Sequence, residues 1–181
     1  DFKLDSLMKN ISMVFQSVYL FADTIENNIK FGCPDATHEQ VVEAAKKACC
    51  HDFISALPDG YDTVIGEGGG TLSGGEKQRI SIARAMLKDA PIIILDEATA
   101  YADPENEALI QQAISKLVAG KSLIVVAHRL NTIRNADQIL VVANGEIVGG
   151  GIHEELLQNC PLYRKMWQDY VGSMEGGTED V

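Results

Sequence analysis

The stretch LSGGEKQR at residues 72–79, followed by IIILDEAT at residues 92–99, decides the fold of this chain. The first stretch contains Ser73-x-x-Glu76, a capping box in which each side chain accepts a hydrogen bond from the backbone of the other residue at a helix start. The second opens with four aliphatic residues, as expected of a strand covered on both faces, and then gives two carboxylates. Together they predict a glycine-rich helix start and an acidic strand end.

The predicted helix start can bind an anion. Ser73, Gly74 and Gly75 offer a hydroxyl and free backbone N–H groups at the positive end of the helix dipole. Glycine also lets a phosphate approach the backbone closely. The alternative is a plain capped helix whose glycines serve only the turn, and the acidic strand that follows favours the phosphate site.

The acidic strand end can hold a metal ion. Asp96 can bind Mg²⁺ against the β- and γ-phosphates of a nucleotide, and Glu97 can orient or deprotonate the attacking water. The alternative is that strands often end in polar residues, so the pair alone would be weak evidence. Combined with the glycine-rich helix start, the two carboxylates indicate a nucleotide triphosphatase.

The rest of the chain alternates strands and helices. Apolar runs predict strands at residues 11–15, 91–95 and 122–127, the last two buried, and Asn144-Gly145 predicts a hairpin. Helical segments are predicted at residues 24–57, 73–88, from Asp103 onward, at 153–158 and at 161–170. This order predicts right-handed crossovers and a mainly parallel α/β sheet.

Polar residues follow the ends of the predicted parallel strands. Gln16, Asp96 with Glu97, and His128 each come directly after an apolar run. Ligands bind at the carboxyl edge of such sheets, so we expect these side chains at one site. Gln16 could bind Mg²⁺ or orient the water, and His128 could contact a γ-phosphate or position the water of Glu97.

Composition narrows the class of protein. The chain has 181 residues and a net charge of −11, which argues against non-specific binding of nucleic acid. Its four cysteines lack metal-ligand spacing and indicate a reduced environment. No apolar run approaches the ~18 residues of a membrane helix.

A phosphate loop of the form Gly-x-x-x-x-Gly-Lys-Ser/Thr does not occur in the chain. The segment SKLVAGKS at residues 115–122 resembles one with its first glycine replaced. A working loop follows a strand and opens a helix, whereas this segment is predicted to end a helix and open a strand. We therefore reject it as a phosphate site.

These motifs resemble the C-terminal part of an ABC transporter nucleotide-binding domain over residues 4–170. Residues 72–78 match the signature motif of that family and residues 92–97 its Walker B motif. Gln16, Asp103 and His128 match the Q-loop, D-loop and H-loop residues. Residues 18–29 and 57–67 resemble those of exporters, whose corresponding segments contact the membrane domain.

The resemblance implies a P-loop NTPase (RecA-like) fold with an inserted helical subdomain and a site for ATP and Mg²⁺. It implies Glu97 as the catalytic base, His128 as a transition-state contact, and Asp96 and Gln16 as magnesium residues. Ser73, Gly74, Gly75 and Glu76 would complete the site of a second ABC ATPase domain in a homo- or heterodimer, with Asp103 near the interface. The other partner implied is the transmembrane domain of an exporter, which places the chain at the cytoplasmic face of the membrane, without nucleic acid.

The chain begins at Asp1, and we expect it to be part of a longer protein, with the N-terminal portion of the fold and its Walker A loop outside it. Residues 1–171 would be a partial ATPase domain, divided into a helical subdomain (17–88) and the remaining core (89–171), and residues 172–181 a disordered acidic tail. We expect this chain alone to be inactive and to self-associate through unpaired strand edges. The alternatives are a soluble ABC ATPase acting on ribosomes or DNA, disfavoured by the charge, and a non-catalytic interaction module, disfavoured by Glu97 and His128.

Overall fold

The computed structural model describes residues 3–96, 104–127 and 129–175. The chain forms two compact units, Asp1–Val126 and Ala127–Val181. Each unit has its own buried apolar cluster. The predicted division into a helical subdomain (17–88) and a remaining core (89–171) has different bounds and remains a prediction.

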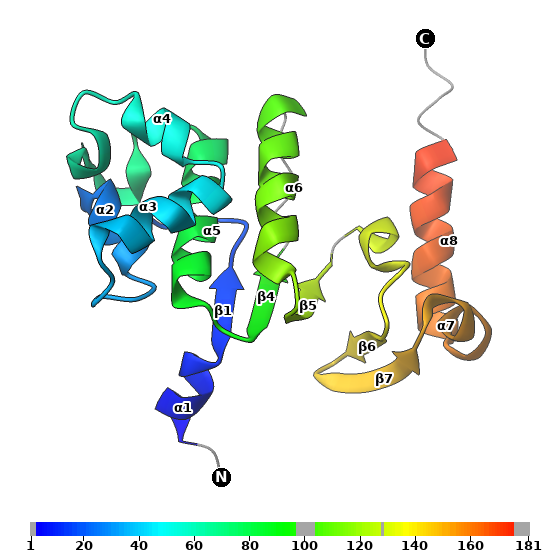
Figure 1. Cartoon of the computed structure of the whole chain (residues 1–181). Coiled ribbons are helices and arrows are strands. Elements are labelled where there is room, and N and C mark those ends of the chain that lie inside the picture. The colour runs from blue at the N-terminus through cyan, green and yellow to red at the C-terminus, as the bar shows by residue number, and fades with distance from the viewer. Residues whose placement is uncertain (1–2, 97–103, 128, 176–181) are drawn as a thin grey trace. The chain divides into compact units, whose positions relative to one another are not determined.

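The first unit contains a parallel three-stranded sheet in the order β1 (Ile11–Val14), β4 (Ile92–Asp96), β5 (Ser122–Val126) (Figure 1). Val14 pairs with Leu95, and Asp96 pairs with Val126. The carboxyl ends of all three strands therefore lie at one edge of the sheet. This confirms the predicted parallel α/β sheet and all three of its strands to within one residue at each end.

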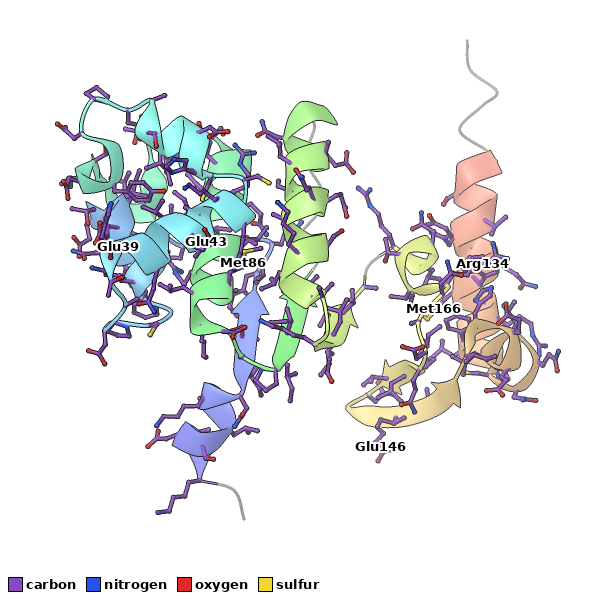
Figure 2. All side chains as sticks on the ribbon, viewed as in Figure 1. Glu39, Glu43, Met86, Arg134, Glu146 and Met166 are labelled. Atoms are coloured by element: carbon purple, nitrogen blue, oxygen red, sulfur yellow. The ribbon has the colours of Figure 1, made fainter. Side chains whose placement is uncertain are left out.

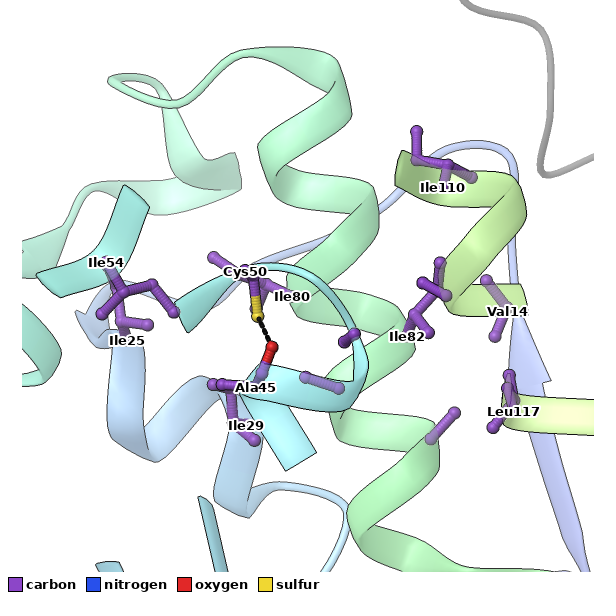
Figure 3. Close-up of a cluster of buried hydrophobic side chains, with 14 of the residues drawn as sticks. Val14, Ile25, Ile29, Ala45, Cys50, Ile54, Ile80, Ile82, Ile110 and Leu117 are labelled. Atoms are coloured by element: carbon purple, nitrogen blue, oxygen red, sulfur yellow. Dashed lines mark hydrogen bonds between the residues drawn. The ribbon is translucent and has the colours of Figure 1, made fainter. Parts of the chain in front are cut away.

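Helices of the first unit pack around a long central helix, α5 (Gly74–Lys88), which contacts α2 (Ile25–Lys30), α3 (His38–Lys47) and α6 (Pro104–Val118). Two shorter helices, α1 (Leu4–Lys9) and α4 (His51–Ser55), complete the set described. Figure 3 shows the apolar core that results, with labelled residues from β1 and from helices α2, α5 and α6. Fully buried members of this core include Val14, Ile25, Ile29, Ile80, Ile82 and Ile110.

Local signals in the sequence account for the helices. Thr37 caps α3 through a full capping box with Gln40. Ser73 and Glu76 form the predicted capping box of α5. The buried residues of α3 leave Glu39 and Glu43 exposed on its outer side (Figure 2). Helix α6 buries Ile110, Ala113, Ile114 and Leu117, whose spacing places them on one face of the helix.

Three features of the first unit add to or correct what the sequence predicted. The segment at residues 24–57 is helical as predicted and consists of three helices, with Cys49 between α3 and α4 at a φ of 56°. Residues 58–71, where the sequence predicted neither a helix nor a strand, contain β3 (Val64–Ile65), which pairs antiparallel with β2 (Asp23–Thr24). Strand β5 was predicted to be buried, but all five of its residues are exposed within the first unit.

The second unit is a hairpin followed by two helices. Strands β6 (Ile139–Ala143) and β7 (Glu146–Gly151) pair antiparallel around the predicted turn, where Asn144 and Gly145 both have positive φ. Helices α7 (His153–Asn159) and α8 (Pro161–Glu175) pack on each other, and His153 Nδ1 lies 2.8 Å from the Tyr163 hydroxyl in their buried contact.

Helix α8 is longer than expected. It was predicted over residues 161–170, and it continues to Glu175. The disordered tail predicted for residues 172–181 is therefore wrong for its first four residues, and the remaining six lie outside the described residues. In the described residues, every helix is too short or too polar to cross a lipid bilayer.

Candidate functional site

The N-terminus of α5 is the first component of the candidate site. Glu76 N–H donates to Ser73 Oγ at 3.3 Å, and Ser73 N–H donates to the Glu76 carboxylate at 2.8 Å. Glu76 is thus used in the cap. The Ser73 hydroxyl still has its own proton to donate, and the N–H groups of Gly74 and Gly75 have no acceptor in a preceding helical turn. These donors gather at the positive end of the helix dipole, so the chemistry suits a phosphate.

Gly75 has a packing role that the sequence did not reveal. It is buried, and a Cβ at this position would lie 2.7 Å from Asn106 Cγ of α6 and 2.8 Å from its Oδ1. The glycine therefore allows α6 to approach α5 closely. In the same contact the Arg79 guanidinium donates to Asn106 Oδ1 at 2.5 Å. Arg79 is 4% exposed, so this contact fixes a buried cation between the two helices.

The carboxyl edge of the sheet is the second component. Asp96 is the half-buried last residue of β4, and Gln16 lies exposed just beyond β1. Since Val14 pairs with Leu95 in neighbouring strands, Gln16 and Asp96 follow paired positions at the same sheet edge. Carboxylate and amide oxygens are ligands that Mg²⁺ accepts, usually together with substrate phosphates. The two residues fit a magnesium site in donor type and in placement.

Gln78 is a residue whose role sequence reasoning missed. Its side chain is fully buried, and its Nε2 donates to the backbone oxygen of Phe15 at 3.3 Å. Phe15 directly precedes Gln16. The sequence gives little signal for this role, because the buried face of α5 also includes the polar residues Arg79 and Ser81.

Glu97, Asp103 and His128 lie outside the described residues, and their proposed roles stay predictions. Their chain neighbours are described. Asp96 ends β4 directly before Glu97, and β5 ends at Val126, two residues before His128.

Residues 115–122, rejected above as a phosphate loop, end a helix and open a strand as predicted. Helix α6 ends at Val118, Gly120 has a φ of +72°, and β5 begins at Ser122. The Lys121 ammonium is 2.8 Å from the Asp89 carboxylate. The segment is therefore a helix-to-strand turn with its lysine in an ion pair.

A groove of about 350 Å³ lies on the first unit near Gln16. Its lining includes Tyr19, Phe21 and Phe31, with the Phe21 and Phe31 rings 4.7 Å apart. The Arg84 guanidinium carbon lies 5.7 Å and 5.4 Å from the centres of these two rings, and burial lowers the pKa of Arg84. Tyr19 donates to the Glu67 carboxylate at 3.0 Å, and this hydrogen bond raises the pKa of Tyr19.

Comparison with known proteins matches these features to one family. Residues 2–100 match the family model described as ABC transporter. The chain is 54% identical over 181 residues to an ATP-dependent lipid A-core flippase of Syntrophus aciditrophicus (strain SB), covering 97% of this chain and 30% of the relative. It is 55% identical over 166 residues to ABC transporter B family member 2 of Dictyostelium discoideum, covering 92% of this chain and 12% of that protein.

A solved structure agrees with the sequence relatives. The chain is similar to a bacterial Atm1-family ABC exporter with ATP bound, with a TM-score of 0.78 and 43% identity, covering 91% of this chain and 29% of that one. The chain thus spans about 30% or less of the length of these relatives. The family model, the relatives and the parallel sheet with its capped α5 all agree, and the chain belongs to the ABC transporter family, as part of an ATPase domain of exporter type.

Proposed function

We propose that this chain supplies part of two composite ATP sites in a dimeric ABC exporter. The observation that carries the proposal is the start of α5, where Ser73 and two glycines present unused donors at a helix N-terminus. In the proposed dimer these donors face the γ-phosphate of a nucleotide held mainly by the second ATPase domain. The carboxyl edge of the sheet, with Asp96 and Gln16, faces the nucleotide of its own domain.

The roles of the chain's residues follow from their chemistry. Glu97 accepts a proton from the attacking water, and His128 donates to the transferring phosphate. Asp96 and Gln16 would hold Mg²⁺, which supplies positive charge against the β- and γ-phosphate oxygens when bound. Asp103, which precedes α6 in the sequence, would lie near the partner domain in this proposal. Glu76 keeps the helix start in shape through its hydrogen bond to Ser73 N–H.

We propose that the 181-residue chain by itself does not hydrolyse ATP. A phosphate loop with its lysine and amides does not occur in the sequence. Such preorganised donors supply most of the electrostatic stabilisation in phosphoryl transfer. The donors at α5 would serve a second domain, so they do not replace the loop.

We assign the aromatic groove to the second partner, the membrane domain of the exporter. Tyr19 is 53% and Phe31 62% exposed, which is unusual for adjoining large apolar side chains. The relatives extend well beyond the length of this chain, which leaves ample polypeptide to cover the groove. A membrane domain docked there would hold this chain at the cytoplasmic face of the membrane.

The test uses the full-length exporter that contains this chain, purified and assayed for ATP turnover. Ser73→Ala and Glu97→Gln should each lower turnover, the second by at least ~100-fold, because it removes the base. Ser115→Ala is the matched control, since Ser115 is an exposed α6 residue that bonds only its own helix at Gln111. Phe31→Ser should keep basal turnover and lose transport. Wild-type turnover in both Ser73→Ala and Glu97→Gln would refute the composite site.

A further inference from the structure

We propose that Gln78 is a positioning residue that links the two composite sites through one molecule. Its hydrogen bond holds the N-terminal part of α5, which follows Ser73, against the loop that carries Gln16. The inference rests on the proposed function, in which Gln16 serves the nucleotide of its own domain and Ser73 serves the nucleotide of the partner. Neither the relatives nor the family match assigns Gln78 a role.

The first support is burial. Gln78 is 0% exposed and lies among the largest fully buried side chains of the described residues, next in the chain to the buried Arg79 and Ile80. Burying a carboxamide costs free energy unless its donors and acceptors are paired. A leucine or methionine would fill the same space without that cost. The amide is therefore explained by what it bonds, not by the volume it fills.

The second support is the identity of the acceptor. Gln78 Nε2 donates to the backbone oxygen of Phe15, 63 residues away in sequence. Phe15 stands between the last residue of β1 and Gln16. A hydrogen bond to this carbonyl orients the peptide unit that joins Phe15 to Gln16. The contact therefore acts directly on the backbone that directs the Gln16 side chain.

The third support is the short stretch of rigid helix between Gln78 and Ser73. Gln78 lies five residues after Ser73, which is about 7.5 Å along a helix axis. The adjoining residue Arg79 ties the same helical turn to Asn106 of α6. The start of α5 is thus held on two sides by directional contacts. A shift of the Gln16 loop has to move the Ser73 donors, or break the Gln78 contact.

The test measures metal binding directly, in the full-length exporter carrying Glu97→Gln so that ATP is retained. Mn²⁺ replaces Mg²⁺ as the probe, and its affinity in the presence of ATP is measured by electron paramagnetic resonance. Gln78→Met removes the donor and keeps the shape. Substituting a residue that orients a metal ligand without binding the metal itself typically lowers metal affinity by ~10–100-fold. We therefore expect Gln78→Met to bind Mn²⁺ at least ~10-fold more weakly.

Three further variants make the result decisive. Gln16→Ala removes the proposed metal ligand. Ile82→Val is the control, because it shortens a buried α5 side chain that has no polar group. Gln78→Leu is used in place of Gln78→Met if the methionine variant does not fold. Support requires weaker Mn²⁺ binding in the Gln16 and Gln78 variants and wild-type binding in Ile82→Val. Wild-type Mn²⁺ affinity in the Gln78 variant, with weakened binding in Gln16→Ala, overturns the inference and leaves the proposed function intact. Unchanged binding in Gln16→Ala overturns the inference together with the proposed role of Gln16.

Discussion

The contact between Gly75 and Asn106 predicts a strong coupling between two substitutions. A methyl group at Gly75 would lie 2.7 Å from Asn106 Cγ, 2.8 Å from its Oδ1 and 3.0 Å from its Cβ. Unstrained carbon contacts are about 3.5–4.0 Å, so Gly75→Ala forces the helices or the asparagine to move. Overpacking of this kind costs about 1–3 kcal/mol.

Asn106→Ala has a different cost. It removes the acceptor of the buried Arg79 guanidinium, and hydrogen bonds to charged groups contribute about 1.5–3 kcal/mol. It also removes the two Asn106 atoms that a methyl at Gly75 would strike first. In the double variant the nearest remaining side-chain atom is the Cβ of residue 106 at 3.0 Å, so the added methyl should cost much less than it does beside Asn106. The expected coupling energy is therefore most of the steric cost of about 1–3 kcal/mol, in favour of the double variant.

The assay is urea unfolding of the four chains, followed by far-ultraviolet circular dichroism. With a slope of about 2 kcal/mol per molar urea, a 2 kcal/mol loss lowers the midpoint by about 1 M. Gly66→Ala is the matched control, because Gly66 has a φ of −66° and open space where the methyl would go. Additive effects of Gly75→Ala and Asn106→Ala, within about 0.5 kcal/mol, would refute the contact.

Three other expectations follow from the first unit. Gly32→Ala should destabilise the chain by about 3 kcal/mol in the same urea assay, because its Cβ would lie 2.2 Å from the backbone oxygen of Arg84, which cannot swing away. The chain alone should self-associate through the exposed apolar strand β5, and light scattering should show this as an apparent mass above that of a monomer. Ile124→Lys should reduce that mass, and a monodisperse wild-type monomer would contradict the expectation. Burial raises the pKa of the Cys50 thiol from 9.0 to about 12, so the folded state favours the neutral thiol, and stability should fall as pH rises from 9.0 to about 12. Cys50→Ala should remove a slope of at most about 1.4 kcal/mol per pH unit, and an unchanged slope would count against the shift.

Features set by neighbouring residues could be predicted from the sequence. The capping box at Ser73 needs only residues three apart, and the turn at Asn144-Gly145 needs only two residues that accept positive φ. The apolar run from Ile92 similarly identified β4 to within a residue. In each case the physical cause lies within one turn or one strand, so a single sequence contains it.

Features set by distant residues could not be predicted in the same way. Strand β3 is only two residues long and is defined by pairing with β2, about forty residues earlier, and two residues show no periodicity. The aliphatic composition of β5 indicates that it favours burial, but composition does not identify what would cover it. The sequence analysis explained Gly75 by the close approach of a phosphate to the backbone. Its burial against Asn106 could not be predicted, because that contact depends on how α6 packs on α5.

The buried polar contacts of α5 have a consequence for how the helix can move. Apolar packing through Ile80 and Ile82 stabilises the helix against its neighbours, but such packing is non-directional and tolerates small slides. The hydrogen bonds of Gln78 and Arg79 are directional and leave costly unpaired groups when they break. They therefore restrict the start of α5 to one position relative to β1 and α6. A change at the Gln16 loop should then reach Ser73 as a shift of the whole helix rather than as local fraying of its first turn.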